Sequence, residues 1–232
     1  MWLFNKNKVK ISSQDILDAK KRFWRFIKTS PLIKSERLSE KYSANIFLKR
    51  EDLQAVRSYK IRWAYNLIHS LSNKEKKAWV VCASAWNHAQ WVAITCFQLK
   101  IKGVIFMPIT TPEQKIYKTK QFWWEFIEVK LIWDTFDEAF NASKKYQDEN
   151  GSTFVHPFDD ERIITGQATI WLEIFEELEK EPDFIICPIW WGWVVSWIIT
   201  AKNCFKKKTK IIWVEPEWAT SMKKSLKKGS NL

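Results

Sequence analysis

Six short runs of β-branched and aromatic residues alternate along the chain with stretches of helical hydrophobic periodicity. The runs expected to be strands are residues 46–49, 80–83, 104–107, 126–129, 184–188 and 211–214. The stretches expected to be helices are residues 62–71, 87–99, 112–122, 136–149, 170–180 and 194–205. Alternation of strands and helices at this spacing is typical of parallel sheets covered by helices. The sequence therefore predicts an α/β fold with parallel or mixed sheets flanked by helices.

Local signals mark where two of these helices begin and where the chain leaves regular structure. Thr111 precedes a proline at the expected first helical position, and Thr135 is followed by acidic residues in the expected first turn. Residues 150–165 contain Gly151, Pro157 and an acidic run. We expect this segment to be a loop that crosses between two lobes.

The charge balance raises the question of a nucleic-acid partner. The chain has 38 Lys and Arg against 26 Asp and Glu, a net charge of +12, and 16 tryptophans. Basic, aromatic-rich proteins include binders of single-stranded nucleic acid. Here the basic residues are mostly interspersed with acidic ones, and the clearest cluster is confined to residues 206–210. We therefore expect no nucleic-acid partner.

Cysteine usage and hydropathy indicate the compartment. The four cysteines have no C-x-x-C spacing and lie in apolar runs, which predicts buried free thiols in a reducing environment. The three histidines form no metal-ligand pattern. The longest apolar run, residues 188–201, is too short to span a bilayer, and no signal peptide is visible. We expect a cytoplasmic protein with no membrane partner.

Glycine is scarce, and tryptophan stands where glycine is usual. The chain has 5 glycines and 16 tryptophans, whereas glycine normally makes up about 7% of a sequence. Trp86 and Trp190 follow predicted strands, at turns where positive φ and close backbone approach favour glycine. One interpretation is that the tryptophans are true core aromatics. The other is that many mark glycine positions, for example through a UGA codon read as tryptophan.

Seven motifs occur in a fixed order across nearly the whole chain. They are residues 48–54 (LKREDLQ), 57–64 (RSYKIRWA), 83–91 (ASAWNHAQW), 106–108 (FMP), 166–170 (GQATI), 190–194 (WWGWV) and 214–216 (VEP). This ordered set resembles the biosynthetic threonine dehydratases, which are pyridoxal-phosphate enzymes of the tryptophan-synthase-β-like fold type II. At most positions where that family has glycine in these motifs, this chain has tryptophan.

The resemblance implies a role for each motif. Lys60 is the expected catalytic lysine, which bonds to the cofactor aldehyde and removes the substrate Cα proton. The loop expected to bind the substrate carboxylate through backbone N–H groups is Ser84, Ala85, Trp86, Asn87 and His88. Asn87 is also expected to contact the cofactor ring hydroxyl. The residues expected to hold the cofactor phosphate are Trp190, Trp191, Gly192, Trp193 and Val194.

The resemblance does not extend to the divalent-cation site of some related enzymes. Glu215 matches one ligand of the divalent-cation site found in some related racemases and dehydratases. Ser221 stands where those enzymes have an aspartate. We therefore expect no metal.

The resemblance also implies an architecture of two lobes. Residues 1–49 would be the N-terminal part of the large lobe, residues 50–150 the small lobe, and residues 151–232 the truncated second part of the large lobe. We expect the large lobe to be incomplete and the C-terminal regulatory domain, which senses isoleucine, to be absent.

The implied activity is dehydration and deamination of L-threonine to 2-oxobutanoate and ammonia, the first step of isoleucine biosynthesis. The substrate is a small amino acid, the cofactor is pyridoxal 5'-phosphate, and the full-length protein is expected to be a homo-oligomer. The alternatives are a catabolic serine/threonine dehydratase or serine racemase, a basic aromatic-rich nucleic-acid binder, and an inactive fragment.

Overall fold

The main sheet has four parallel strands in the order β5-β4-β3-β6. In the computed structural model, the described residues are 11–23, 26–55, 57–121, 125–132, 134–156, 160–189 and 193–228. The strands of the main sheet are β3 (Val80–Ala83), β4 (Gly103–Met107), β5 (Ile127–Leu131) and β6 (Thr153–Phe154). Two small sheets accompany it: β1 (Leu32–Lys34) is antiparallel to β2 (Phe47–Lys49), and β7 (Phe184–Pro188) is parallel to β8 (Lys210–Val214).

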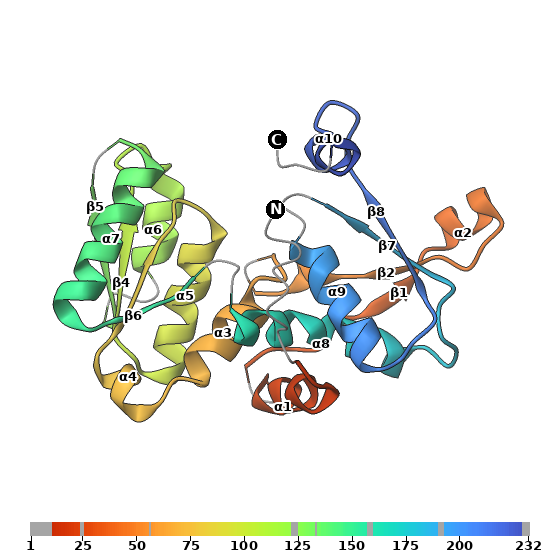
Figure 1. Ribbon diagram of the computed structural model, residues 1–232, viewed down its shortest axis with the longest axis horizontal. Coiled ribbons are helices and arrows are strands. Elements are labelled where there is room, and N and C mark those ends of the chain that lie inside the picture. The colour runs from red at the N-terminus through yellow and green to blue at the C-terminus, as the bar shows by residue number, and fades with distance from the viewer. Residues whose placement is uncertain are drawn as a thin grey trace.

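The helices separate into two groups around these sheets (Figure 1). Their bounds are α1 (Ser13–Phe23), α2 (Glu36–Tyr42), α3 (Ile61–His69), α4 (Asn73–Lys77), α5 (Asn87–Leu99), α6 (Glu113–Gln121), α7 (Phe136–Asn150), α8 (Glu161–Glu177), α9 (Trp193–Cys204) and α10 (Ser221–Lys228), with a 3-10 turn, η2 (Glu51–Leu53). Helices α4 to α7 accompany the four-stranded sheet, and α1, α2, α8, α9 and α10 accompany the two small sheets (Figure 1). Helix α3 lies where the two groups meet (Figure 1).

Both faces of the four-stranded sheet are covered by helices. Val80 and Cys82 belong to the largest apolar cluster, which includes residues of α3 and α5. Val81 and Ala83 belong to a separate cluster that includes Ala139 of α7. Because successive side chains of a strand point to opposite faces, helices must lie on both sides, which is the arrangement that a parallel sheet requires. The α/β prediction is confirmed.

A buried ion-pair network ties α3 to elements distant in the sequence. The side chain of Arg62 is fully buried. Its Nη2 donates hydrogen bonds to Glu51 Oε1 at 2.7 Å and to Glu173 Oε2 at 2.8 Å. Lys49 Nζ lies 2.8 Å from the same Glu173 oxygen. An unpaired buried charge is strongly unfavourable, so these partners fix the position of α3 against η2, β2 and α8.

Helices α3 and α8 also approach each other closely at Gly166. A Cβ added to Gly166 would lie 2.8 Å from the carbonyl oxygen of Arg62 and 3.0 Å from the Cα of Trp63. Both are backbone atoms, which cannot move aside as a flexible side chain can. Gly166 therefore allows the two helix backbones to come together.

The six predicted strands and six predicted helices are all present, with ends shifted by a few residues except at α8. The expectation that residues 150–165 form a loop is wrong, because the segment contains β6 and the first turn of α8. Asp160 is the N-cap of α8, and its Oδ1 accepts a hydrogen bond from the backbone N–H of Arg162 at 2.7 Å. The acidic run is a helix start, where carboxylates are favoured by the helix dipole.

Several other local expectations are also settled. Thr135 caps α7 in a reciprocal capping box with Glu138, as predicted. All four cysteines are free, and all but the partly buried Cys204 are fully buried. Within the described ranges, no helix is long and apolar enough to cross a membrane. None of the predicted strands and helices corresponds to β1, β6, α1, α2, α4 or α10.

We expect Gly166→Ala to destabilise the chain by about 1–3 kcal/mol, because the added methyl group forces α3 and α8 apart. The measurement is the free energy of unfolding from urea titration followed by circular dichroism. A matched control is Asp148→Ala on the exposed part of α7, for which we expect a change within about 0.5 kcal/mol. Equal stability of Gly166→Ala and the control would show that the close approach is not required.

Candidate cofactor site

Lys60 lies at the head of α3, directly after a strained turn. It is the N-cap residue of the helix, and its side chain is partly buried. Three residues earlier, Arg57 has a φ of 50°, in the left-handed region that non-glycine residues rarely adopt. The Arg57 N–H donates a 2.7 Å hydrogen bond to the carbonyl oxygen of Gln54 and so closes this turn. Strained backbone of this kind often occurs next to functional groups.

The electrostatic surroundings of Lys60 favour its neutral amine. Burial lowers the pKa of Lys60, and the nearby charge of Lys115 lowers it further. No carboxylate among the described residues forms an ion pair with Lys60. A larger share of Lys60 is therefore uncharged near neutral pH than for an ordinary surface lysine. A nucleophilic lysine needs this property.

Residues 84–88 form the turn between β3 and α5. The N–H of Ser84 extends the sheet by donating to the carbonyl oxygen of Phe106 at 2.9 Å, and its Oγ accepts from the N–H of Trp86 at 3.1 Å. Helix α5 then begins at Asn87. The first N–H groups of a helix have no partner within the helix, and they carry the positive end of its dipole. This turn can bind a carboxylate.

The structure brings a further residue, Lys115, to this turn. Its Nζ donates a 2.8 Å hydrogen bond to Oδ1 of Asn87. Lys115 lies in the first turn of α6, which follows β4, and β4 is the neighbour of β3 in the sheet. The carboxyl ends of adjacent parallel strands meet at one edge, so the loops that follow them converge. This topological argument could have identified Lys115, but it requires the strand order.

His88 anchors the turn from inside the protein. It is buried, and burial lowers its pKa to about 3, so the ring is neutral. Its Nε2 lies 3.1 Å from the carbonyl oxygen of Val155. A carbonyl oxygen can only accept, so Nε2 carries the proton. The ring also stacks on Trp63, with centroids 4.6 Å apart. His88 therefore has a structural role here, and its backbone belongs to the turn.

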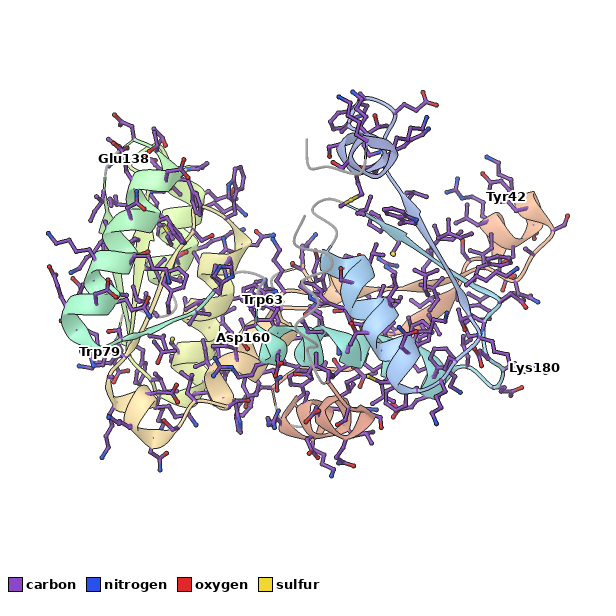
Figure 2. All side chains as sticks on the ribbon, in the orientation of Figure 1. Tyr42, Trp63, Trp79, Glu138, Asp160 and Lys180 are labelled. Carbon is purple, nitrogen blue, oxygen red and sulfur yellow. The ribbon has the colours of Figure 1, made fainter. Side chains whose placement is uncertain are left out.

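The tryptophans do not have the surroundings that indoles normally have. Trp63, Trp91 and Trp171 are almost completely buried, yet their indole N–H groups find no hydrogen-bond partner in the part of the chain that is described. Each unsatisfied buried donor costs about 1–3 kcal/mol. Figure 2 shows Trp63 at the junction of the two groups of elements and Trp79 at the outer end of the four-stranded sheet.

The backbone of two tryptophans bears on the proposed glycine positions. Trp86 is 65% exposed and has a φ of −124°, so the expectation of a left-handed tryptophan there is wrong. Trp86 is the N-cap of α5, a position that has extended backbone. Among the described tryptophans, the one in the left-handed region is Trp79, with a φ of 66°. A left-handed conformation at a bulky residue is a genuine outlier and favours glycine.

The predicted phosphate loop is described only at its flanks. Trp190, Trp191 and Gly192 lie outside the described residues, and of Trp193 only the backbone, at the start of α9, is described. Val194 is partly buried and packs against two of the apolar clusters. The segment joins β7 to the N-terminus of α9, the kind of strand-to-helix connection that binds phosphate in other α/β folds.

Glu215 has a structural role in this protein. Its two carboxylate oxygens accept hydrogen bonds from the backbone N–H groups of Met222 and Lys223, each at 3.0 Å. These bonds satisfy free donors in the first turn of α10. Over the described ranges, no group of three or more His, Cys, Asp or Glu side chains could hold a metal ion.

The residues at this edge of the sheet fit an anionic cofactor that carries an aldehyde. Lys115 contacts the Asn87 carboxamide at the N-terminus of α5, and Lys60, whose pKa is lowered, interacts electrostatically with both Lys115 and His88. The chemistry of this donor set suits an aldehyde, a ring oxygen and a carboxylate. Pyridoxal phosphate is the cofactor that combines an aldehyde with a phosphate and a ring oxygen.

Comparison with known proteins points to the same cofactor, pyridoxal phosphate. The family model described as "Pyridoxal-phosphate dependent enzyme" matches residues 23–232. The chain is 45% identical over 220 residues to the biosynthetic L-threonine dehydratase of Halalkalibacterium halodurans, covering 95% of this chain and 53% of that protein. It thus spans about half the length of the curated relatives it matches.

Solved structures have the same fold. The processed form of threonine deaminase isoform 2 from Solanum lycopersicum superposes with a TM-score of 0.84 at 36% identity, covering 94% of this chain and 59% of that one. Maize serine racemase superposes with a TM-score of 0.87 at 27% identity, covering 95% and 66%. The match to the family model spans most of the chain and agrees with the site described above. The chain belongs to the family of pyridoxal-phosphate-dependent enzymes.

Proposed function

We propose that this chain carries the cofactor site of a lyase that converts L-threonine to 2-oxobutanoate and ammonia, the entry step of isoleucine biosynthesis. The observation that carries the proposal is the half-buried Lys60, held at the head of α3 near the turn at residues 84–88. The curated relatives, which are named biosynthetic L-threonine dehydratases, support threonine as the substrate.

Each residue of the site has a proposed task. When bound, the cofactor supplies an aldehyde that bonds to an amine and a ring that takes up the electron pair left on Cα. Lys60 would hold the cofactor through its aldehyde, and Lys60 Nζ, when free and neutral, would accept the Cα proton. The backbone N–H groups of residues 84–88 bind the substrate carboxylate, Asn87 binds the ring oxygen, and residues 190–194 hold the phosphate.

The relatives favour this function over the alternatives. Serine racemase shares the fold at 27% identity, whereas the curated threonine dehydratases reach 41–45%. A nucleic-acid binder would be expected to present a continuous basic groove. Here Lys115 donates a hydrogen bond to the Asn87 carboxamide at the N-terminus of α5, and its charge acts on Lys60.

The wider setting of the site is part of the same proposal. Residues 50–150 make the small lobe, and residues 1–49 and 151–232 belong to a large lobe that is incomplete here. The small sheets lie outside the four-stranded sheet, which supports a division into two lobes, and because β6 belongs to the four-stranded sheet the small lobe extends to Phe154 rather than ending at residue 150. The full-length enzyme is a cytoplasmic homo-oligomer that acts on a small amino acid and binds no nucleic acid, membrane or metal.

We expect Lys60 to be the lysine that bonds to the cofactor. The chain is incubated with excess pyridoxal phosphate, reduced with cyanoborohydride and digested, and the labelled lysines are quantified by mass spectrometry. Because its pKa is lowered, Lys60 should carry at least about fivefold more label than the exposed Lys118. Lys60→Ala should lose this label, and Lys118→Ala should keep it. Preferential labelling of another lysine would remove Lys60 from the mechanism.

We also expect tryptophan to block the phosphate loop. In a version extended to the length of the relatives, glycine at positions 86, 190, 191 and 193 should increase the affinity for pyridoxal phosphate by orders of magnitude. An indole at position 190, 191 or 193 would take up space that a phosphate needs beside backbone N–H groups, and any of these residues that had to be left-handed would add roughly 1–2 kcal/mol of strain. The measurement is equilibrium dialysis.

The control for this experiment is Trp218→Gly, since Trp218 is 82% exposed and belongs to none of the proposed loops. We expect its affinity for the cofactor to equal that of the tryptophan version. Tight binding by the unchanged tryptophan version would contradict the requirement for glycine. UGG codons in the gene at Trp86, Trp190 and Trp191 would contradict the interpretation that these tryptophans mark glycine positions.

The activity itself is tested on the same extended version with the four glycines. We expect it to form 2-oxobutanoate and ammonia from L-threonine, with both products measured directly, and to form no D-serine from L-serine. The Lys60→Ala form should lose nearly all turnover, because one amine both binds the cofactor and moves the proton. Racemisation of serine without keto-acid formation would favour the racemase alternative.

A further inference from the structure

Lys115 interacts with Asn87 and Lys60, which both have proposed roles in the site. The proposed function does not yet give Lys115 a role of its own. Its Nζ donates to Asn87 Oδ1 at 2.8 Å, and its charge acts on Lys60. We propose that Lys115 is a positioning residue of the cofactor site, whose ammonium group sets the orientation of the Asn87 carboxamide and places a second positive charge beside Lys60. This inference rests on the proposed function for the identity of the ligand.

The contact with Lys115 determines which way the Asn87 carboxamide points. An ammonium group has only donors, so it can bond only to the oxygen of a carboxamide. With Oδ1 held by Lys115, the Nδ2 donors of Asn87 must point the other way. Nδ2 donates to no acceptor in the part of the chain that is described, and Asn87 is only partly buried. Asn87 is therefore oriented to donate a hydrogen bond, which is what an anionic ring oxygen of the cofactor requires.

The backbone of Lys115 is fixed by hydrogen bonds within α6. Its backbone N–H donates to the carbonyl oxygen of Pro112 at 2.8 Å, in the first turn of α6. Its own carbonyl oxygen accepts from the buried Thr119 hydroxyl at 2.8 Å. The backbone of Lys115 is thus held at both ends of its turn. A side chain that starts from a fixed backbone loses less entropy when it holds a partner.

The positive charge of Lys115 affects the protonation of Lys60. The titratable groups of the described residues that act electrostatically with Lys60 are Lys115 from α6 and His88 from α5, and His88 is neutral. No described carboxylate pairs with either lysine. The positive charge of Lys115, with no carboxylate paired to it, disfavours a second positive charge on Lys60 and so favours the neutral amine. A bound anion relieves the repulsion, so the pair also attracts the anionic groups of the cofactor and substrate.

The test uses the unliganded chain, so it does not depend on cofactor binding. Lys60 is acetylated with limiting isotopic acetic anhydride over a range of pH, and mass spectrometry of its peptide gives its apparent pKa. Because Lys115→Met removes a neighbouring positive charge, the labelling rate of Lys60 near pH 8 should fall by about two- to fivefold. Lys118→Met, which removes an exposed lysine from the same helix, should leave the rate unchanged.

Two further variants separate charge from hydrogen bonding. Lys115→Gln keeps a donor but loses the charge, so the Lys60 rate should fall while the Asn87 side-chain amide keeps its resonance position in the spectrum of [15N]asparagine-labelled protein. Lys115→Arg keeps both and should change neither measurement, and Lys115→Met should change both. Asn87→Ala assigns the resonance. Circular dichroism confirms that each variant is folded, and Lys115→Arg provides the folded reference.

The outcomes distinguish this inference from the proposed function. If Lys115→Met leaves Lys60 labelling and the Asn87 resonance unchanged, the positioning role is overturned, even when pyridoxal phosphate is trapped on Lys60. If Lys115→Met shifts both measurements while the cofactor is trapped elsewhere, the positioning role stands and the proposed function fails.

Discussion

The buried charge of Arg62 is the constraint on which the rest of the structure depends. A guanidinium group inside a protein must be neutralised, and here Glu51 and Glu173 each accept two hydrogen bonds from it. Arg62 follows Lys60 by two residues, so the same hydrogen bonds that satisfy the guanidinium also fix where the head of α3 lies. The position of the proposed catalytic amine is thus set by ion pairs that do not contact it.

The fold was predictable because its signals are local. The central strands β3 and β4 are short apolar runs, and α7 begins at a capping box that the sequence displays. The acidic run before α8 was misinterpreted, because Asp160 has the composition of a loop residue as well as that of an N-cap. Helices α2 and α4 have no buried residues, so they lack the apolar periodicity by which a helix is recognised.

The candidate site was predictable only in part. Lys60 and Asn87 could be proposed from motifs that are continuous in the sequence. Lys115 could not, because its contact with Asn87 depends on β3 and β4 being neighbours. Arg62 gave no signal either, since an arginine in a short motif is expected at the surface until its buried partners are known. Contacts between distant segments are set by topology, which a residue pattern does not contain.

The long sequence separation within the Arg62 network also affects how the protein forms during synthesis. Lys49, Glu51 and Arg62 leave the ribosome well before Glu173 and Glu177, with the whole four-stranded sheet between them. Until α8 emerges, Arg62 lacks one of its two counter-charges. Burial of its guanidinium group is therefore energetically unfavourable at that stage. The proposed catalytic amine therefore reaches its final place only late in translation, and the sheet can assemble before the site does.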